Sequence, residues 1–192
     1  MSLEIFAKTN WVDLVIVIVS CRICYVAMRT GFSVEIFKFF GALLSIYTSM
    51  HYYPFLSDFI GQFIKMEGDG LAFMDFISYI VLAVLGYALF ILMRHTFARF
   101  IKLEAVPNLN KFGGLFLGMF RAVFLTSLIM FGCVISTLDY MKTSVHSSFL
   151  GTQILSVAPN TYAWMWDNLM SKFMTSEKFN NTILEVQDNA NS

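Results

Sequence analysis

The chain has 192 residues, of which 57% are apolar and 14% are charged, and its formal net charge is zero. Soluble proteins carry about 25% charged residues, and a soluble globule of this size could not bury so much apolar surface. The same composition excludes a disordered chain, a coiled coil, a collagen-like fold and a disulfide scaffold, and the zero net charge excludes a nucleic-acid partner. We therefore predict a membrane protein, whose first partner is the lipid bilayer.

Four stretches are long and apolar enough to cross a membrane core of about 30 Å, which takes about 20 helical residues. They cover residues 11–28, 33–53, 74–93 and 113–138, and Pro54 is predicted to close the second. Each must be helical, because an open strand would leave backbone groups without hydrogen bonds in lipid. The predicted fold class is all-α: a multi-pass membrane protein with four transmembrane helices plus one or two amphipathic interfacial helices.

Two further segments have apolar and polar residues at helical spacing. Residues 55–65 and residues 161–175 are predicted to be amphipathic helices that lie on the membrane surface. For 161–175 a fifth span is the alternative, against which Asp167 and Lys172 interrupt the apolar run. Residues 176–192 are rich in Asn and Ser and are predicted to be a disordered tail.

Basic residues near the span ends predict the orientation, because cytoplasmic loops are enriched in them. The first and third loops carry five, namely Arg29, Arg94, Arg99, Lys102 and Lys111. The opposite side carries three, namely Lys8, Lys65 and Lys142. We therefore expect both loops in the cytoplasm and both termini outside. Arg94, Arg99 and Lys102 are also predicted to bind anionic lipid headgroups.

Charged residues inside the spans are the first candidates for a functional site, because each costs about 2.5–3.5 kcal/mol at the centre of a membrane helix. Asp13 lies near the start of the first helix, where simple hydration at a helix N-terminus is the alternative to a functional role. Arg22 lies deeper and leans away from its nearer surface, so we expect it to pair with Glu35 across the turn. Alternatively, Glu35 caps its own helix and Arg22 binds carbonyl groups or Ser. Lys38 can reach the surface without a partner.

Small residues in the fourth span predict close helix packing. Gly114 and Gly118 form a G-x-x-x-G motif, and Gly113 and Ala122 extend the same smooth face. Arg121 lies three residues after Gly118, inside the helix. We interpret it as an anchor at the membrane interface, with binding of anionic headgroups as the alternative.

The sequence contains no recognisable catalytic or metal-binding motif. Cys21 and Cys24 are spaced as C-x-x-C, but inside a membrane helix this spacing indicates packing. His51, His95 and His146 are scattered near span ends, and no H-E-x-x-H, G-x-S-x-G or phosphate-binding glycine loop occurs. We therefore predict no enzyme activity, no cofactor and no metal site.

Several of these residues follow one another in a characteristic order. Trp11-Val12-Asp13 opens the first helix, Gly31-Phe32 forms the first turn, and Glu35 follows three residues later. Leu109-Asn110-Lys111-Phe112-Gly113-Gly114 then leads into Gly118, Arg121 and Ala122. In this order and spacing the chain resembles the colicin V production protein (CvpA) family of bacterial inner-membrane proteins. The resemblance covers roughly residues 10–160, which we take as the transmembrane domain.

The resemblance implies a multi-pass inner-membrane protein associated with colicin V production or export and with envelope upkeep, its termini then facing the periplasm. It marks motif residues of unassigned role: Asp13, Gly31, Phe32, Glu35, Gly114, Gly118 and Arg121. The chain departs from the family pattern at Thr30, which stands between Arg29 and Gly31 where a basic residue usually precedes the Gly-Phe pair directly. Arg22 is not part of the pattern.

Two classes of function remain open. The first is a non-enzymatic membrane accessory protein that acts through helix packing, with copies of itself or with other membrane proteins as partners. The second is a subunit of an oligomeric small channel or transporter, in which Asp13, Glu35 and Arg121 line a polar path. A path requires the two carboxylates to face a shared cavity, whereas an accessory protein leaves them at interfaces or paired internally.

Overall fold

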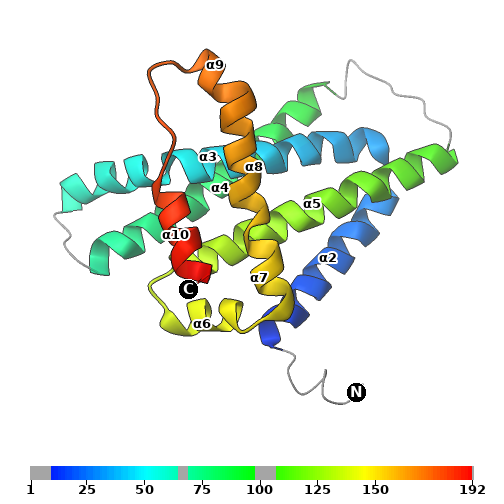
Figure 1. The fold of residues 1–192 in the computed structure, drawn as a ribbon. Coiled ribbons are helices and arrows are strands. Elements are labelled where there is room, and N and C mark those ends of the chain that lie inside the picture. The colour runs from blue at the N-terminus through cyan, green and yellow to red at the C-terminus, as the bar shows by residue number, and fades with distance from the viewer. Residues whose placement is uncertain (1–9, 65–68, 98–106, 192) are drawn as a thin grey trace.

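Four long helices form the body of the protein, in a computed structural model that describes residues 10–64, 69–97 and 107–191. They are α2 (Trp11–Thr30), α3 (Phe32–Ile64), α4 (Asp69–Phe97) and α5 (Pro107–Ile135) (Figure 1). Each contains an apolar stretch long enough to cross a membrane, and the described ranges contain no strand. The predicted all-α fold with four transmembrane helices is confirmed.

The starts of α3 and α5 lie together at one end of the bundle. There the backbone N–H of Phe32 donates to Oδ1 of Asn110 at 2.7 Å. The two helices therefore run in the same direction, with α4 antiparallel to both (Figure 1). Hydrogen bonds between helices add to the packing, as when the Tyr79 hydroxyl on α4 donates to the carbonyl of Leu128 on α5 at 2.9 Å. Such bonds fix the positions of helices in a membrane, because apolar contact with another helix is no more favourable there than apolar contact with lipid.

The second span does not end at Pro54. α3 continues to Ile64, so the predicted separate surface helix at residues 55–65 is wrong. Proline lacks the N–H that would bond to the carbonyl four residues earlier, which is that of Met50. The side-chain amide of Asn180 donates to this carbonyl at 2.7 Å instead. The helix passes through the proline because a segment remote in sequence supplies the missing donor.

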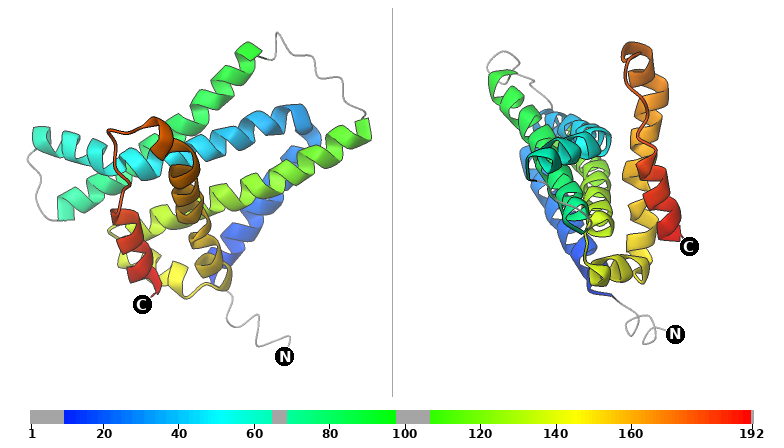
Figure 2. Two further views of the ribbon diagram at one scale, coloured as in Figure 1. Left: turned by 45° about the horizontal axis from the view of Figure 1, so that its top comes forward. Right: turned by 90° about the vertical axis from the view of Figure 1, so that its left-hand side faces the viewer.

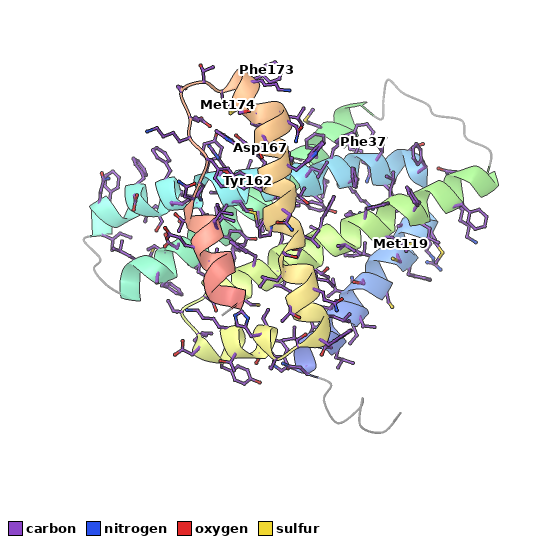
Figure 3. The ribbon with its side chains drawn as sticks, in the orientation of Figure 1. Phe37, Met119, Tyr162, Asp167, Phe173 and Met174 are labelled. Carbon is purple, nitrogen blue, oxygen red and sulfur yellow. The ribbon has the colours of Figure 1, made fainter. Side chains whose placement is uncertain are left out.

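The residues after α5 form a second layer on one face of the bundle (Figure 2). They fold as α6 (Asp139–His146), α7 (Phe149–Leu155), α8 (Val157–Met165), the π-helical η1 (Trp166–Met170) and α9 (Ser171–Phe173). From α7 to α9 these helices stack end to end, and we call this stack the C-terminal column. It packs against α3 and α5, with Tyr162 where it crosses the bundle and Phe173 at its far end (Figure 3). The four candidate spans of the described residues do not include it, so a fifth span gains no support.

The apolar stripe predicted for residues 161–175 packs partly against protein. Tyr162 is completely buried and Trp166 is 8% exposed, whereas Phe173 is 82% exposed. Further along the chain, α10 (Thr182–Asn191) lies in the segment predicted to be disordered, and that prediction is wrong for these residues. Ile183 is completely buried there. A few apolar side chains therefore anchor α10 to the rest of the protein, although the composition of this segment is otherwise typical of disorder.

An aromatic cluster joins the C-terminal column to α3. The imidazole of His51 stacks on the rings of Tyr47 and Trp166, with centroids 5.2 and 5.1 Å away. Its Nδ1 lies 2.8 Å from the hydroxyl of Tyr162, and its Nε2 lies 2.8 Å from Oε2 of Glu177. Burial raises the pKa of Tyr162 to about 12, so this phenol stays protonated at neutral pH. The sequence had shown His51 only as an isolated histidine near a span end.

Candidate functional site

Three charged side chains meet near the turn between α2 and α3. Glu35 lies in the first turn of α3 and is completely buried. Its Oε1 accepts hydrogen bonds from the Thr30 hydroxyl at 2.6 Å and from Nζ of Lys38 at 2.7 Å. Its Oε2 forms an ion pair with Nη1 of Arg121 on α5 at 2.8 Å, without the geometry of a directed hydrogen bond. We call Thr30, Glu35, Lys38 and Arg121 the charged cluster.

Arg121 is a buried member of this cluster rather than an interface anchor. Its residue is 3% exposed, although it belongs to a helix that crosses the membrane. Nη1 lies 3.5 Å from the hydroxyl of Tyr87 on α4, and Nε is buried without a hydrogen-bond partner. Arg121 thus links α5 to α3 and α4, and the predicted anchor role is wrong.

The predicted pair of Arg22 with Glu35 is also wrong. Arg22 is exposed on α2, and the partners of Glu35 are Arg121 and Lys38. The expectation that Lys38 needs no partner fails for the same reason, because its side chain is only 14% exposed and contacts Glu35. Neighbours across a turn were the nearest candidates in the sequence, whereas the actual partner comes from the fourth span.

The charged cluster has one cation more than it has carboxylates. Lys38 and Arg121 both contact the single carboxylate of Glu35, and no other carboxylate among the described residues pairs with either of them. Removing one partner from a buried ion pair costs about 3–5 kcal/mol, because the other charge is left uncompensated in a medium of low polarity. Both cations therefore depend on Glu35, whose loss would leave two uncompensated charges.

The motif glycines let the backbone of α2 approach α5 beside this cluster. A Cβ at Gly114 would lie 2.7 Å from the carbonyl oxygen of Ala27, and one at Gly118 would collide with the Cβ of Ala27. Gly31 has a φ of 77°, which favours glycine, and a Cβ there would meet the side chain of Asn110. The close approach predicted for the G-x-x-x-G motif therefore occurs within the chain, against α2.

Asp13 lies at the opposite end of α2 and holds a different contact. It is 6% exposed, and its Oδ1 accepts from the Ser148 hydroxyl at 2.6 Å and from the backbone N–H of Leu150 at 2.8 Å. It also forms a capping box with Asn10 at the start of α2. Asp13 therefore ties the first helix to the start of α7, and the alternative of a hydrated carboxylate is wrong.

An apolar groove of about 660 Å³ lies between α2 and α4, with α5 as its floor. Its lining includes Val19 and Ile23 of α2, Val84 and Tyr87 of α4, and Leu125 and Ile129 of α5. Asp13, Glu35 and Arg121 do not line it. The structure does not bring the two carboxylates into a shared cavity within the described residues, which was the condition for a polar path.

Sequence reasoning missed most partners of the motif residues. Thr30, noted only as a departure from the family pattern, donates directly to Glu35, whereas Arg29 is exposed and lies 4.8 Å from the ring centre of Tyr25. Asn110 belongs to the motif of residues 109–114. Its position shortly before the glycines was the one signal in the sequence that could have indicated its contact with Phe32. Several basic residues of the orientation and headgroup predictions lie outside the described residues, namely Lys8, Lys65, Arg99 and Lys102.

The motif residues thus divide between two places in the fold. Gly31, Phe32, Glu35, Gly114, Gly118 and Arg121 gather where the end of α2 and the start of α3 pack against the first half of α5. No group of three or more His, Cys, Asp or Glu side chains in the described residues could hold a metal ion. Neither a curated protein nor a solved structure shows significant similarity to the chain. Among protein families, the family described as Colicin V production protein matches residues 12–159. The chain therefore belongs to the colicin V production protein family and is a multi-pass membrane protein.

Proposed function

We propose that this protein is a non-catalytic accessory protein of the bacterial inner membrane that supports the production or export of a colicin V type toxin, and with it envelope upkeep. The family match supports the link to the toxin, and the family is not a known enzyme family. The single observation that carries the mode of action is that the motif's ionisable residues are engaged internally. Asp13 binds Ser148, and Glu35 binds Arg121 and Lys38.

The proposed partners are further copies of this chain or other membrane proteins. The G-x-x-x-G face is already occupied by α2, so partners have to use other exposed faces, of which the outer side of α2 is one. Cys21 is exposed on α2 and offers a native probe. Mild oxidation of membranes should trap a disulfide-linked dimer that is absent in Cys21→Ser. If no dimer forms while the monomer is intact, association of copies through α2 is refuted.

We further propose that the termini face the periplasm. The ends of α2 and α4, next to which the sequence carries more basic residues, lie at the same end of the bundle, which supports a single choice of cytoplasmic side (Figure 1). An alkaline phosphatase fused to the C-terminus should be active, and a green fluorescent protein fused there should stay dark. The reverse result would place the termini in the cytoplasm.

The function itself is tested by complementation. A colicin V producing strain that lacks its own family member should regain a zone of growth inhibition when it expresses this chain. Absence of the zone, with the chain present in membranes at normal amounts, contradicts the proposal. Proteoliposomes separate the channel alternative, because we expect no proton or ion flux above that of empty vesicles. Flux that is lost in Asp13→Asn would favour the channel instead.

A further inference from the structure

The charged cluster carries a formal charge of plus one, because two cations share one carboxylate. The excess sits on a helix bundle that crosses a membrane, where an uncompensated charge is costly. The buried Nε of Arg121, which lacks a hydrogen-bond partner, is a free donor in the same place. An acidic group at the open side of the cluster would compensate the excess charge.

The apolar groove begins beside this cluster. Tyr87 belongs to both: it is one of the residues that line the groove, and its hydroxyl lies 3.5 Å from Nη1 of Arg121. The groove volume of about 660 Å³ is typical of ligand sites, which measure about 300–1,000 Å³ and are lined mainly by apolar side chains. Ile80 and Val84 line it and are 40% and 61% exposed, so the groove opens on the outer side of α4, toward lipid.

Lys38 gives the cluster a route to the membrane surface. It lies six positions after the start of α3, which is about 9 Å along the helix axis. Helical side chains lean toward the N-terminus of their own helix, so its ammonium group lies closer to the surface than its Cα. The side chain is 14% exposed, whereas that of Arg121 is 4% exposed. An acidic lipid headgroup can therefore approach the cluster from the Lys38 side.

We propose that the protein binds one anionic phospholipid, with its phosphate group at Lys38, beside the buried Arg121, and an acyl chain in the groove between α2 and α4. The charge selects an acidic headgroup, and the groove supplies the apolar contact. A free anion would use the charge but not the groove, and a zwitterionic lipid would use the groove but not the charge. The proposal does not involve Arg94, Arg99 or Lys102, and it does not depend on the toxin-related function.

The test is native mass spectrometry of the protein extracted from vesicles of phosphatidylcholine with one fifth phosphatidylglycerol. Wild type should retain one phosphatidylglycerol preferentially. Lys38→Gln leaves the ion pair of Glu35 with Arg121 in place, and it should lower the affinity for phosphatidylglycerol about fivefold, the usual effect of one basic residue. Arg22→Gln removes an exposed cation from α2 and should change nothing. Val84→Trp fills the groove and should reduce the retention of both lipids.

Any of the following four results would overturn the proposal. Equal retention of the two lipids by wild type would show that no acidic headgroup is selected. Equal losses in Arg22→Gln and Lys38→Gln would show attraction by overall charge only. Displacement of the lipid by millimolar inorganic phosphate would show that the cluster binds free anions. Unchanged retention in Val84→Trp, with an unaltered melting temperature, would exclude the groove.

Discussion

Single substitutions in the charged cluster should destabilise the protein in a fixed order. Glu35→Gln strands two cations, because Lys38 and Arg121 share this carboxylate. Arg121→Gln leaves Glu35 with Lys38 and Thr30 as partners. Lys38→Gln leaves Glu35 with Arg121 and removes the excess charge. We therefore expect Glu35→Gln to be the most harmful of the three and Lys38→Gln the least.

The magnitudes follow from burial and from the number of partners lost. Glu35 is completely buried and loses both cations, so Glu35→Gln should lower the free energy of unfolding by about 3–5 kcal/mol. Arg121→Gln removes a buried charged donor while the carboxylate keeps a cation, which should cost about 1–3 kcal/mol. Lys38 is partly exposed, and a pair of this kind contributes about 1 kcal/mol or less.

The assay is reversible unfolding of the purified protein in mixed micelles, titrated with sodium dodecyl sulfate and followed by tryptophan fluorescence. Arg22→Gln serves as the matched control, because it removes an exposed cation from the same bundle and should change the free energy by less than about 0.5 kcal/mol. A loss in Lys38→Gln as large as that in Glu35→Gln would refute the assigned partners. So would an Arg121→Gln variant with wild-type stability.

Three further predictions concern helix packing, the proline and the tyrosine. Gly118→Val should cost about 1–3 kcal/mol of stability by overpacking the contact of α5 with α2, whereas Gly61→Ala meets only the end of a flexible leucine side chain at 3.1 Å and should be tolerated; melting temperatures in detergent compare the two. Asn180→Ala should cost about 1–3 kcal/mol by leaving a carbonyl of α3 without a donor. In a Pro54→Ala background that cost should shrink, because the new N–H can bond to the same carbonyl, and additive losses in the double-mutant cycle would disprove the repair. The pKa of Tyr162 is raised from 10.0 to about 12, so the unfolded state ionises first and this contribution to stability is lost between about pH 10 and 12. Tyr162→Phe should show a shallower loss across that range in the same unfolding titration, and an identical slope would exclude the effect.

The spans could be predicted from the sequence because their signal is local. The expected stretches 11–28, 74–93 and 113–138 each fall largely within one observed helix, since a run of about 20 apolar residues admits no other structure in lipid. Close packing at the glycine motif could also be predicted, because a smooth helix face lets a neighbouring helix approach closely. The identity of that neighbour, Ala27, was not readable, since small residues on several spans would have fitted.

The charged cluster was predictable only in part. That Arg121 and Glu35 are costly in lipid and need explanation followed from their position in apolar runs. Their pairing did not follow, because it depends on how α3 and α5 are rotated about their axes and on where along the bundle they meet. The same limit applies to Asp13 and Ser148, which lie 135 positions apart in the sequence.

Pro54 and Asn180 show the common reason why the sequence did not predict these contacts. In water a proline ends a helix, since the freed carbonyl and the altered backbone can be solvated, whereas within a bundle a donor from elsewhere can restore the lost bond. The donor here stands 130 positions beyond Met50, in a segment whose composition is typical of disorder. In each case a polar group on one span is matched by a group from a distant segment, and the match fixes helices that apolar contact alone would leave free to slide. A bundle fixed at both ends of α2, by Asp13 at one end and by the contacts of Gly114 and Gly118 at the other, is built to hold a shape. That arrangement supports the proposed accessory function, in which the protein presents a fixed surface to membrane partners, over the proposed alternative of a channel.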